Sequence, residues 1–146
     1  MTPDVNVLVA ASRADHVHHA VAWRWLNGAL EASLKGSRFD LLPIAIAGFL
    51  RVVTSEQVFA DPTPVEAAVE FVEALLSSPG VDMLALGAEW PTLRRLAIEQ
   101  NLSGNDIPDA WIAAAVRASD GHLVTFDRAF KRLLGKRELT ILTTGK

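Results

Sequence analysis

The chain has 146 residues, of which half are hydrophobic and 21% are charged, with no cysteine and a formal net charge of −3. This composition is typical of a globular protein, and we expect one domain that spans residues 1–146. The lack of cysteine excludes disulfides, zinc–thiolate sites and thiol catalysis, so any metal must be held by oxygen or imidazole ligands.

The N-terminal stretch 1–10 is mostly apolar but contains Asp4 and Asn6. A buried carboxylate is costly unless donors, a base or a metal ion compensate its charge. Two interpretations stay open for this stretch alone. Asp4 caps a turn while Asn6 hydrogen-bonds to the local backbone, or Asp4 is the first ligand of a cation site.

Helical spacing of apolar residues and helix-start signals predict helices along most of the chain. Asp15 is expected to cap the first long helix and Pro43 to begin the second. Thr63 is expected to cap the third, with Pro64 in its first position. The helices predicted in this way cover residues 16–34, 43–54, 64–76, 89–101, 109–119 and 128–134.

Short segments of strand composition lie between the later helices, at residues 81–86, 122–126 and 139–142. Strands that alternate with helices predict an α/β sandwich with a mostly parallel central sheet, whose functional sites form beyond the carboxyl ends of strands. Asp127 directly follows one of these strands. Because no apolar run approaches ~18 residues and the N-terminus does not resemble a signal peptide, we expect a soluble cytoplasmic protein with no membrane contact.

Two further stretches combine acidic residues with structural signals. Asp106 can cap the Ala-rich helix while Asp109 faces its free amides, a role that accounts for one acid but not for both. Thr125 and Asp127 lie two residues apart where a buried strand meets a helix, and Asp127 could be a helix cap worth roughly 1 kcal/mol. Each stretch taken alone is more often structural than catalytic.

Taken together, residues 4–9, 109–114 and 125–130 resemble the PIN-domain family in their order and spacing, and more narrowly its VapC toxin branch. The resemblance extends over nearly the whole chain. It implies a three-layer α/β sandwich with about four to five short strands in a mostly parallel sheet flanked by helices. It also implies that the first strand ends at Asp4 and that a helix begins at Val5.

The resemblance further implies a Mg²⁺- or Mn²⁺-dependent endoribonuclease toxin of a toxin–antitoxin system. Family members usually form homodimers, and a small VapB-like antitoxin inhibits them by inserting into the active groove. Asp4, Asp109 and Asp127 would correspond to three of the metal-binding acids. Asn6 and Thr125 would correspond to the polar residues that support them.

The sequence departs from the family pattern at one position. The family's second acid, a glutamate on the second helix, corresponds here to Ala47 and Gly48, and Glu56 lies two turns further on. Asp106, three residues before Asp109, is the available substitute as a metal ligand, or it is only the helix cap.

Two alternatives stay open. The absent glutamate would suit a PIN-like protein that binds RNA or its antitoxin without cutting. The Asp-x-Asn pattern of Asp4 and Asn6 at the end of a first strand would also suit a small phosphotransfer or phosphatase domain, which would need a lysine near a strand end.

Charge and histidine patterns add two weaker signals. Through Asp127 there are 16 acidic and 8 basic residues, after which Glu138 is the single acid. The basic residues that follow are Arg128, Lys131, Arg132, Lys136, Arg137 and Lys146. They could contact the backbone of single-stranded RNA, or they could be the solvated face of a terminal helix. His16 and His19 could share a helix face as metal ligands do, although such histidines are more often packing residues.

Overall fold

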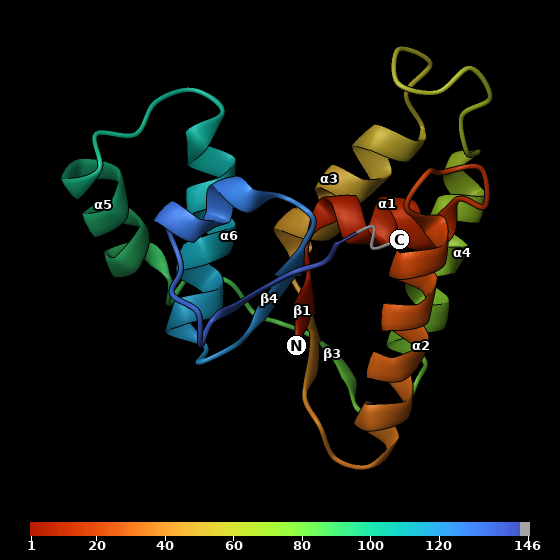
Figure 1. Ribbon diagram of the computed structural model, residues 1–146, viewed down its shortest axis with the longest axis horizontal. Helices are drawn as coiled ribbons and strands as arrows, with labels where there is room; N and C mark the ends of the chain where they lie inside the picture. The colour runs from red at the N-terminus through yellow and green to blue at the C-terminus, as the bar shows by residue number, and fades with distance from the viewer. Residues whose placement is uncertain (144–146) are drawn as a thin grey trace.

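The computed structural model describes residues 1–143, which contain five short strands and six α-helices (Figure 1). The strands are β1 (Thr2–Pro3), β2 (Phe39–Leu41), β3 (Val81–Met83), β4 (Leu123–Thr125) and β5 (Leu139–Ile141). The helices are α1 (Val5–Ser12), α2 (His19–Leu34), α3 (Pro43–Val53), α4 (Val65–Leu76), α5 (Trp90–Glu99), α6 (Asp106–Ala118) and the 3₁₀ helix η1 (Arg128–Arg132).

All strand pairs are parallel. β4 lies between β1 and β5 in one ladder, and β2 pairs with β3 in the other. Met1 joins the two ladders, because its amino group donates to the carbonyl of Arg38 at 2.8 Å and its carbonyl accepts from the N–H of Asp40 at 3.0 Å. The strand order across both ladders is therefore β3-β2-β1-β4-β5. The carboxyl ends of the strands share one edge, where functional groups of parallel sheets gather.

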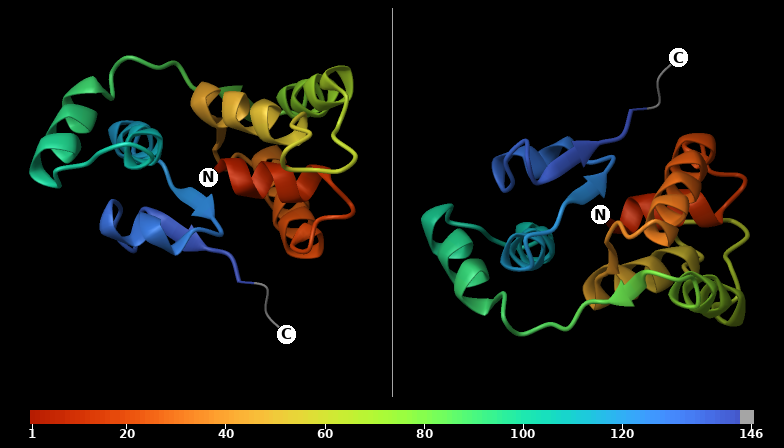
Figure 2. Two further views of the ribbon diagram at one scale, coloured as in Figure 1. Left: turned by 90° about the horizontal axis from the view of Figure 1, so that it is seen from above. Right: turned by 90° about the horizontal axis from the view of Figure 1, so that it is seen from below.

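The helices surround this sheet on different sides. Figure 1 shows α5 and α6 on one side of the molecule and α2 and α4 on the other. The views in Figure 2 place α5 on the outer side of α6, away from α1 to α4. Alanine residues at positions 110, 113 and 114 of α6 are completely buried, so this helix packs closely against the rest of the core. The predicted α/β sandwich with a parallel sheet is confirmed.

The start of the chain agrees with the family resemblance. β1 ends at Pro3 and α1 begins at Val5, although valine favours strands. Residues Val7 to Ala11 of α1 are buried, since α1 packs against both α2 and α3. Burial by these two helices outweighs the local preference of the valines for extended backbone.

Three predicted helix starts were wrong, and each error has a physical cause. α2 begins at His19 rather than at residue 16, because the carboxylate of Asp15 pairs with Arg13 at 2.8 Å. Thr63 also does not cap a helix: its hydroxyl accepts a hydrogen bond from Arg13 at 3.0 Å, and α4 begins at Val65. α6 begins at Asp106, three residues before the predicted start, with Asn105 at the cap position.

The strands differ from the prediction in two places. β2 was missed because its three residues are followed almost at once by the helix start at Pro43. The predicted strand 81–86 is shorter, since only Val81 to Met83 pair with β2. Within residues 1–143, none of the helices has the length and apolar character needed to cross a membrane.

Candidate active site

Asp4 occupies the turn between β1 and α1, where its side chain is 5% exposed. One carboxylate oxygen accepts from the backbone N–H of Val5 at 2.7 Å, and the other accepts from the hydroxyl of Thr125 at 2.7 Å. Burial raises the pKa of the Asp4 carboxyl, while these two hydrogen bonds lower it. Asp4 is therefore a helix cap and also a buried acid at the carboxyl end of a strand.

Thr125 connects the end of β4 to the start of α1. Its side chain is completely buried, and its hydroxyl oxygen also accepts from the backbone N–H of Asp127 at 3.0 Å. Asn6 completes the connection: its side-chain oxygen accepts from the N–H of Phe126 at 3.2 Å, and its amide donates to Thr125 at 3.3 Å. The two predicted supporting residues thus fix the backbone around Asp4 and Asp127.

Asp109 and Asp127 lie near Asp4 but come from α6 and from the end of β4. Asp127 caps η1, with one carboxylate oxygen accepting from the N–H of Ala129 at 2.9 Å. Burial, followed by the charges of Asp4 and Asp127, raises the pKa of Asp109 to about 6. The three carboxylates therefore repel one another across a shared space, and all three line one pocket of about 590 Å³.

The donor set fits a hard divalent cation in its chemistry, because all three side chains offer carboxylate oxygens. The side chain of Asp109 makes no hydrogen bond within residues 1–143, and its pKa is raised by burial and then by the charges of Asp4 and Asp127, a repulsion that a cation would relieve. In the described part of the chain, however, no three acidic or histidine side chains are close enough to form a ready-made metal-binding group. The acids line the pocket without forming a closed chelate.

Asp106 has a different environment from the other predicted ligands. It does not line this pocket, and its carboxylate pairs with the guanidinium of Arg132 at 2.6 Å. This contact holds the pKa of Asp106 below its usual value. The predicted cap role of Asp106 was wrong, because Asn105 occupies the cap position and Asp106 is the first helical residue. That Asp106 replaces the family glutamate as a metal ligand stays a prediction. The ion pair with Arg132 does not favour it, because the carboxylate is already neutralised by that guanidinium.

The positions that correspond to the family glutamate also line the pocket. Ala47 and Gly48 of α3 leave space there, and an added Cβ on Gly48 would lie 2.7 Å from a methyl group of Val5. Gly48 therefore permits the close approach of α3 to α1. Most of the remaining wall is apolar, from residues Val5, Val9, Ile44, Val52, Phe59 and Ile112.

Two polar residues of this wall, His16 and Arg51, were not placed at this site by sequence reasoning. His16 was considered only as a metal ligand that shares a helix face with His19. That arrangement was wrong, because α2 begins at His19, whose ring contacts the carbonyl of Ala10 at 2.8 Å. Arg51 belongs to a segment that resembles the family, which was the available signal. No lysine lines the pocket within the described residues, so the phosphotransfer alternative gains no support.

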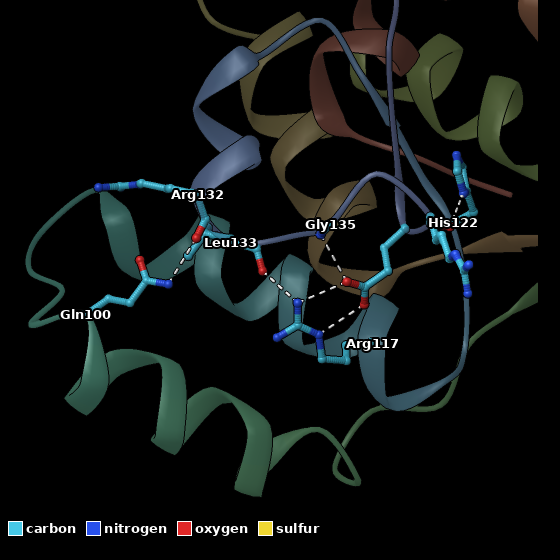
Figure 3. A network of polar contacts seen from close by, with 8 residues as sticks. Gln100, Arg117, His122, Arg132, Leu133 and Gly135 are labelled. Carbon is cyan, nitrogen blue, oxygen red and sulfur yellow. Dashed lines mark hydrogen bonds and ion pairs between the residues drawn. The ribbon is translucent and has the colours of Figure 1, made fainter.

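The basic segment after Asp127 is fixed to α6 and α5 by the network in Figure 3. Arg117 donates twice to Glu138, at 3.0 Å each, and once to the carbonyl of Leu133 at 2.9 Å. Gln100 donates to the carbonyl of Arg132 at 2.9 Å (Figure 3). Lys146, which was grouped with these basic residues, lies outside the described residues.

Comparison with known proteins identifies related chains. The PIN domain family model matches residues 1–136. The chain is 40% identical over 131 residues to VapC ribonuclease Mb2897 of Mycobacterium bovis, covering 88% of this chain and 86% of that protein. It is 36% identical over 143 residues to Ribonuclease VapC25 of Mycobacterium tuberculosis, covering 93% and 94% of the two chains.

A solved structure also shares the fold. A chain in the crystal structure of VapBC2 from Rickettsia felis, bound to a DNA fragment from its promoter, matches with a TM-score of 0.65 and 21% identity. The match covers 97% of this chain and 98% of that one. At this level of identity the similarity concerns the fold.

Proposed function

The chain belongs to the PIN-domain family, and on this basis we propose that it is an endoribonuclease toxin that cleaves RNA phosphodiester bonds with Mg²⁺ or Mn²⁺. The relatives named VapC ribonuclease support the nuclease activity. The observation that carries the proposal for this chain is that Asp4, Asp109 and Asp127, from three different elements, line one pocket. Burial, followed by the charges of Asp4 and Asp127, raises the pKa of Asp109 to about 6 there.

Asp4, Asp109 and Asp127 would hold the cation. A bound divalent cation supplies Lewis acidity, which lowers the pKa of a bound water and neutralises charge on a phosphodiester. Thr125 opposes the effect of burial on Asp4, since its hydroxyl donates to that carboxylate and favours the ionised form. Asn6 holds the backbone of Phe126 and so orients the neighbouring Asp127.

We also propose a VapB-like antitoxin as the partner, a homodimer as the assembled state and one domain over residues 1–146. The related VapBC2 structure and the VapC relatives support the antitoxin. Co-expression with the antitoxin and co-purification test the partner, and light scattering of the purified protein tests the dimer.

The decisive experiment measures cleavage of total RNA by purified protein with and without Mg²⁺. We expect cleavage that requires the cation and falls at least roughly 100-fold in Asp4→Asn and Asp109→Asn, since even outer-sphere partners of a metal are worth ~10–100-fold. Asp82→Asn changes an exposed acid of β3 outside the pocket and serves as the matched control. RNA that is bound but never cut would instead favour the non-cleaving alternative raised by Ala47 and Gly48.

A further inference from the structure

The pocket at the three carboxylates is larger than a metal site alone requires. Its volume of about 590 Å³ falls in the range of ligand sites, ~300–1,000 Å³. The acids lie among walls that are mainly aliphatic and aromatic. The space beside the acids exists because Ala47 and Gly48 project no long side chain into it. A second, non-ionic part of a substrate therefore has room next to the cleavage chemistry.

One wall of this space is held rigidly. Phe59, in the connection between α3 and α4, lines the pocket, and the guanidinium of Arg13 lies 3.8 Å from the centre of its ring. The same arginine donates to the carbonyl of Asp61 at 2.9 Å and to the hydroxyl of Thr63 at 3.0 Å, and it is 8% exposed. The aromatic ring is thus fixed in place before any ligand arrives, which reduces the entropy lost on binding.

His16 supplies an oriented donor to the same pocket. The backbone N–H of His18 donates to the Nδ1 atom of His16 at 3.0 Å. In the neutral ring the proton must therefore reside on Nε2, which makes that atom an N–H donor. Burial lowers the pKa of His16 below its usual value, consistent with a neutral ring. Within residues 1–143, Nε2 has no hydrogen-bond partner of its own.

Arg51 adds positive charge to the same surface. Its side chain is exposed, lines the pocket, and forms no ion pair with another described residue. The guanidinium of Arg51 could therefore contact a phosphate of an RNA backbone that enters the pocket, in addition to any cation held by the acids. An apolar antitoxin side chain in the same space would leave both the His16 N–H and Arg51 without a partner.

We propose that the apolar part of this pocket binds one unpaired nucleobase of the RNA substrate, adjacent to the bond that is cleaved. Phe59 contacts the base through its ring, the Nε2–H of His16 donates to an acceptor on the base edge, and Arg51 contacts the neighbouring phosphate. This inference rests on the proposed nuclease function. It adds that the enzyme recognises the base at one position of the RNA. Contacts to phosphate through a cation could not provide this recognition, because every nucleotide carries the same phosphate.

The test measures binding separately from cleavage. Single-stranded RNA hexanucleotides carry 2-aminopurine at each position in turn, and a matching set carries one abasic nucleotide in turn. Binding to the full chain is followed in Ca²⁺, a cation with the same preference for oxygen ligands. We expect fluorescence quenching at one position, and an abasic nucleotide at that position weakens binding roughly tenfold, as expected for loss of one base stack.

Variants identify the pocket as the cause. Phe59→Leu and His16→Ala should abolish both the quenching and the abasic effect, and His16→Gln, which keeps an N–H donor, should restore part of them. Trp23→Leu removes an exposed aromatic ring of α2 that does not line this pocket and should change neither. Because His16 is partly exposed, its variants report on the pocket even if Phe59→Leu proves too unstable to fold.

The outcomes separate this inference from the proposed function. Cleavage in Mg²⁺ with no quenched position, or with quenching that the variants do not change, overturns the base pocket and leaves the nuclease intact. A quenched position without cleavage supports the pocket and overturns the nuclease. If Phe59→Leu weakens only the complex with antitoxin, the pocket belongs to that partner and the inference is wrong.

Discussion

The hydroxyl of Thr125 donates to the carboxylate of Asp4 over 2.7 Å, although the two residues are 121 positions apart in the sequence. Asp4 directly follows the last residue of β1, and Thr125 is the last residue of the neighbouring strand β4. Because both strands are parallel and paired, their ends bring this acid and its donor together. The hydrogen bond opposes the rise in the pKa of Asp4 that burial causes.

Replacing Thr125 with valine should therefore weaken the metal site without removing a ligand. The Asp4 carboxyl loses its buried donor, its pKa rises further, and the cation concentration needed for half-maximal RNA cleavage should increase ~10–100-fold, as for other partners of metal ligands. A titration of cleavage against Mg²⁺ measures this shift. Thr125→Ser retains the hydroxyl and should remain close to the wild type; an unshifted Mg²⁺ curve for Thr125→Val would contradict the role given to Thr125.

The raised pKa of Asp109 predicts how the metal-free protein responds to pH. The folded-state pKa, about 6, lies above the ordinary value of 3.8. The stability contributed by protonated Asp109 is therefore fully present below about pH 3.8 and is lost as the pH rises through about 6. In EDTA, the melting temperature of Asp109→Asn minus that of the wild type should therefore increase as the pH is raised from about 4 to about 7.

Added Mg²⁺ should reverse this difference at pH 7, because the cation compensates the carboxylates of the wild type and not the amide of the variant. Asp82→Asn, an exposed change on β3, should follow the wild type at every pH. A melting-temperature difference for Asp109→Asn that stays constant between these pH values would show that the carboxyl of Asp109 is not perturbed.

The two positions that replace the family glutamate should respond differently to an introduced acid. Ala47 is exposed and lines the pocket, so Ala47→Glu should fold normally and lower the Mg²⁺ concentration needed for cleavage. Gly48→Glu should destabilise the fold by about 1–3 kcal/mol, because its Cβ would lie 2.7 Å from a methyl group of Val5. Urea denaturation and a Mg²⁺ titration of both variants measure the contrast. Equal stabilities for the two variants would argue against close packing of α3 on α1.

Removing the buried side chain of Arg13 should destabilise the fold. Arg13→Ala leaves the carbonyl of Asp61 and the hydroxyl of Thr63 without their donor and uncovers the ring of Phe59, so we expect a loss of about 2–3 kcal/mol. Arg13→Lys should not restore it, since an ammonium group cannot reproduce the planar set of donors. Urea denaturation measures both, and Asp15→Ala, whose side chain is 65% exposed, should cost less than about 1 kcal/mol.

The sequence predicted those features whose causes are local. Proline is favoured at the first position of a helix, and α3 does begin at Pro43. The position of Asp127 after a buried strand likewise predicted its place at the carboxyl edge of the sheet. The metal-binding roles of Asp4, Asp109 and Asp127 stay a prediction until binding is measured.

Features that depend on distant residues were not predictable in this way. Thr63 carries a strong capping signal, yet its hydroxyl accepts from Arg13, which lies 50 positions away in the sequence. Asp106 similarly binds Arg132, which is 26 positions away. The contribution of His16 to the pocket depends on the path of the chain between α1 and α2, which no local pattern specifies.

The insertion of β4 between β1 and β5 has a consequence during protein synthesis. The ribosome produces Asp4 well before Thr125 and Asp127, which lie more than a hundred positions further along the sequence. Until β4 is released and pairs with β1, Asp4 has neither its hydroxyl donor nor its acidic neighbour. The proposed cation site is therefore incomplete in a chain that still lacks β4.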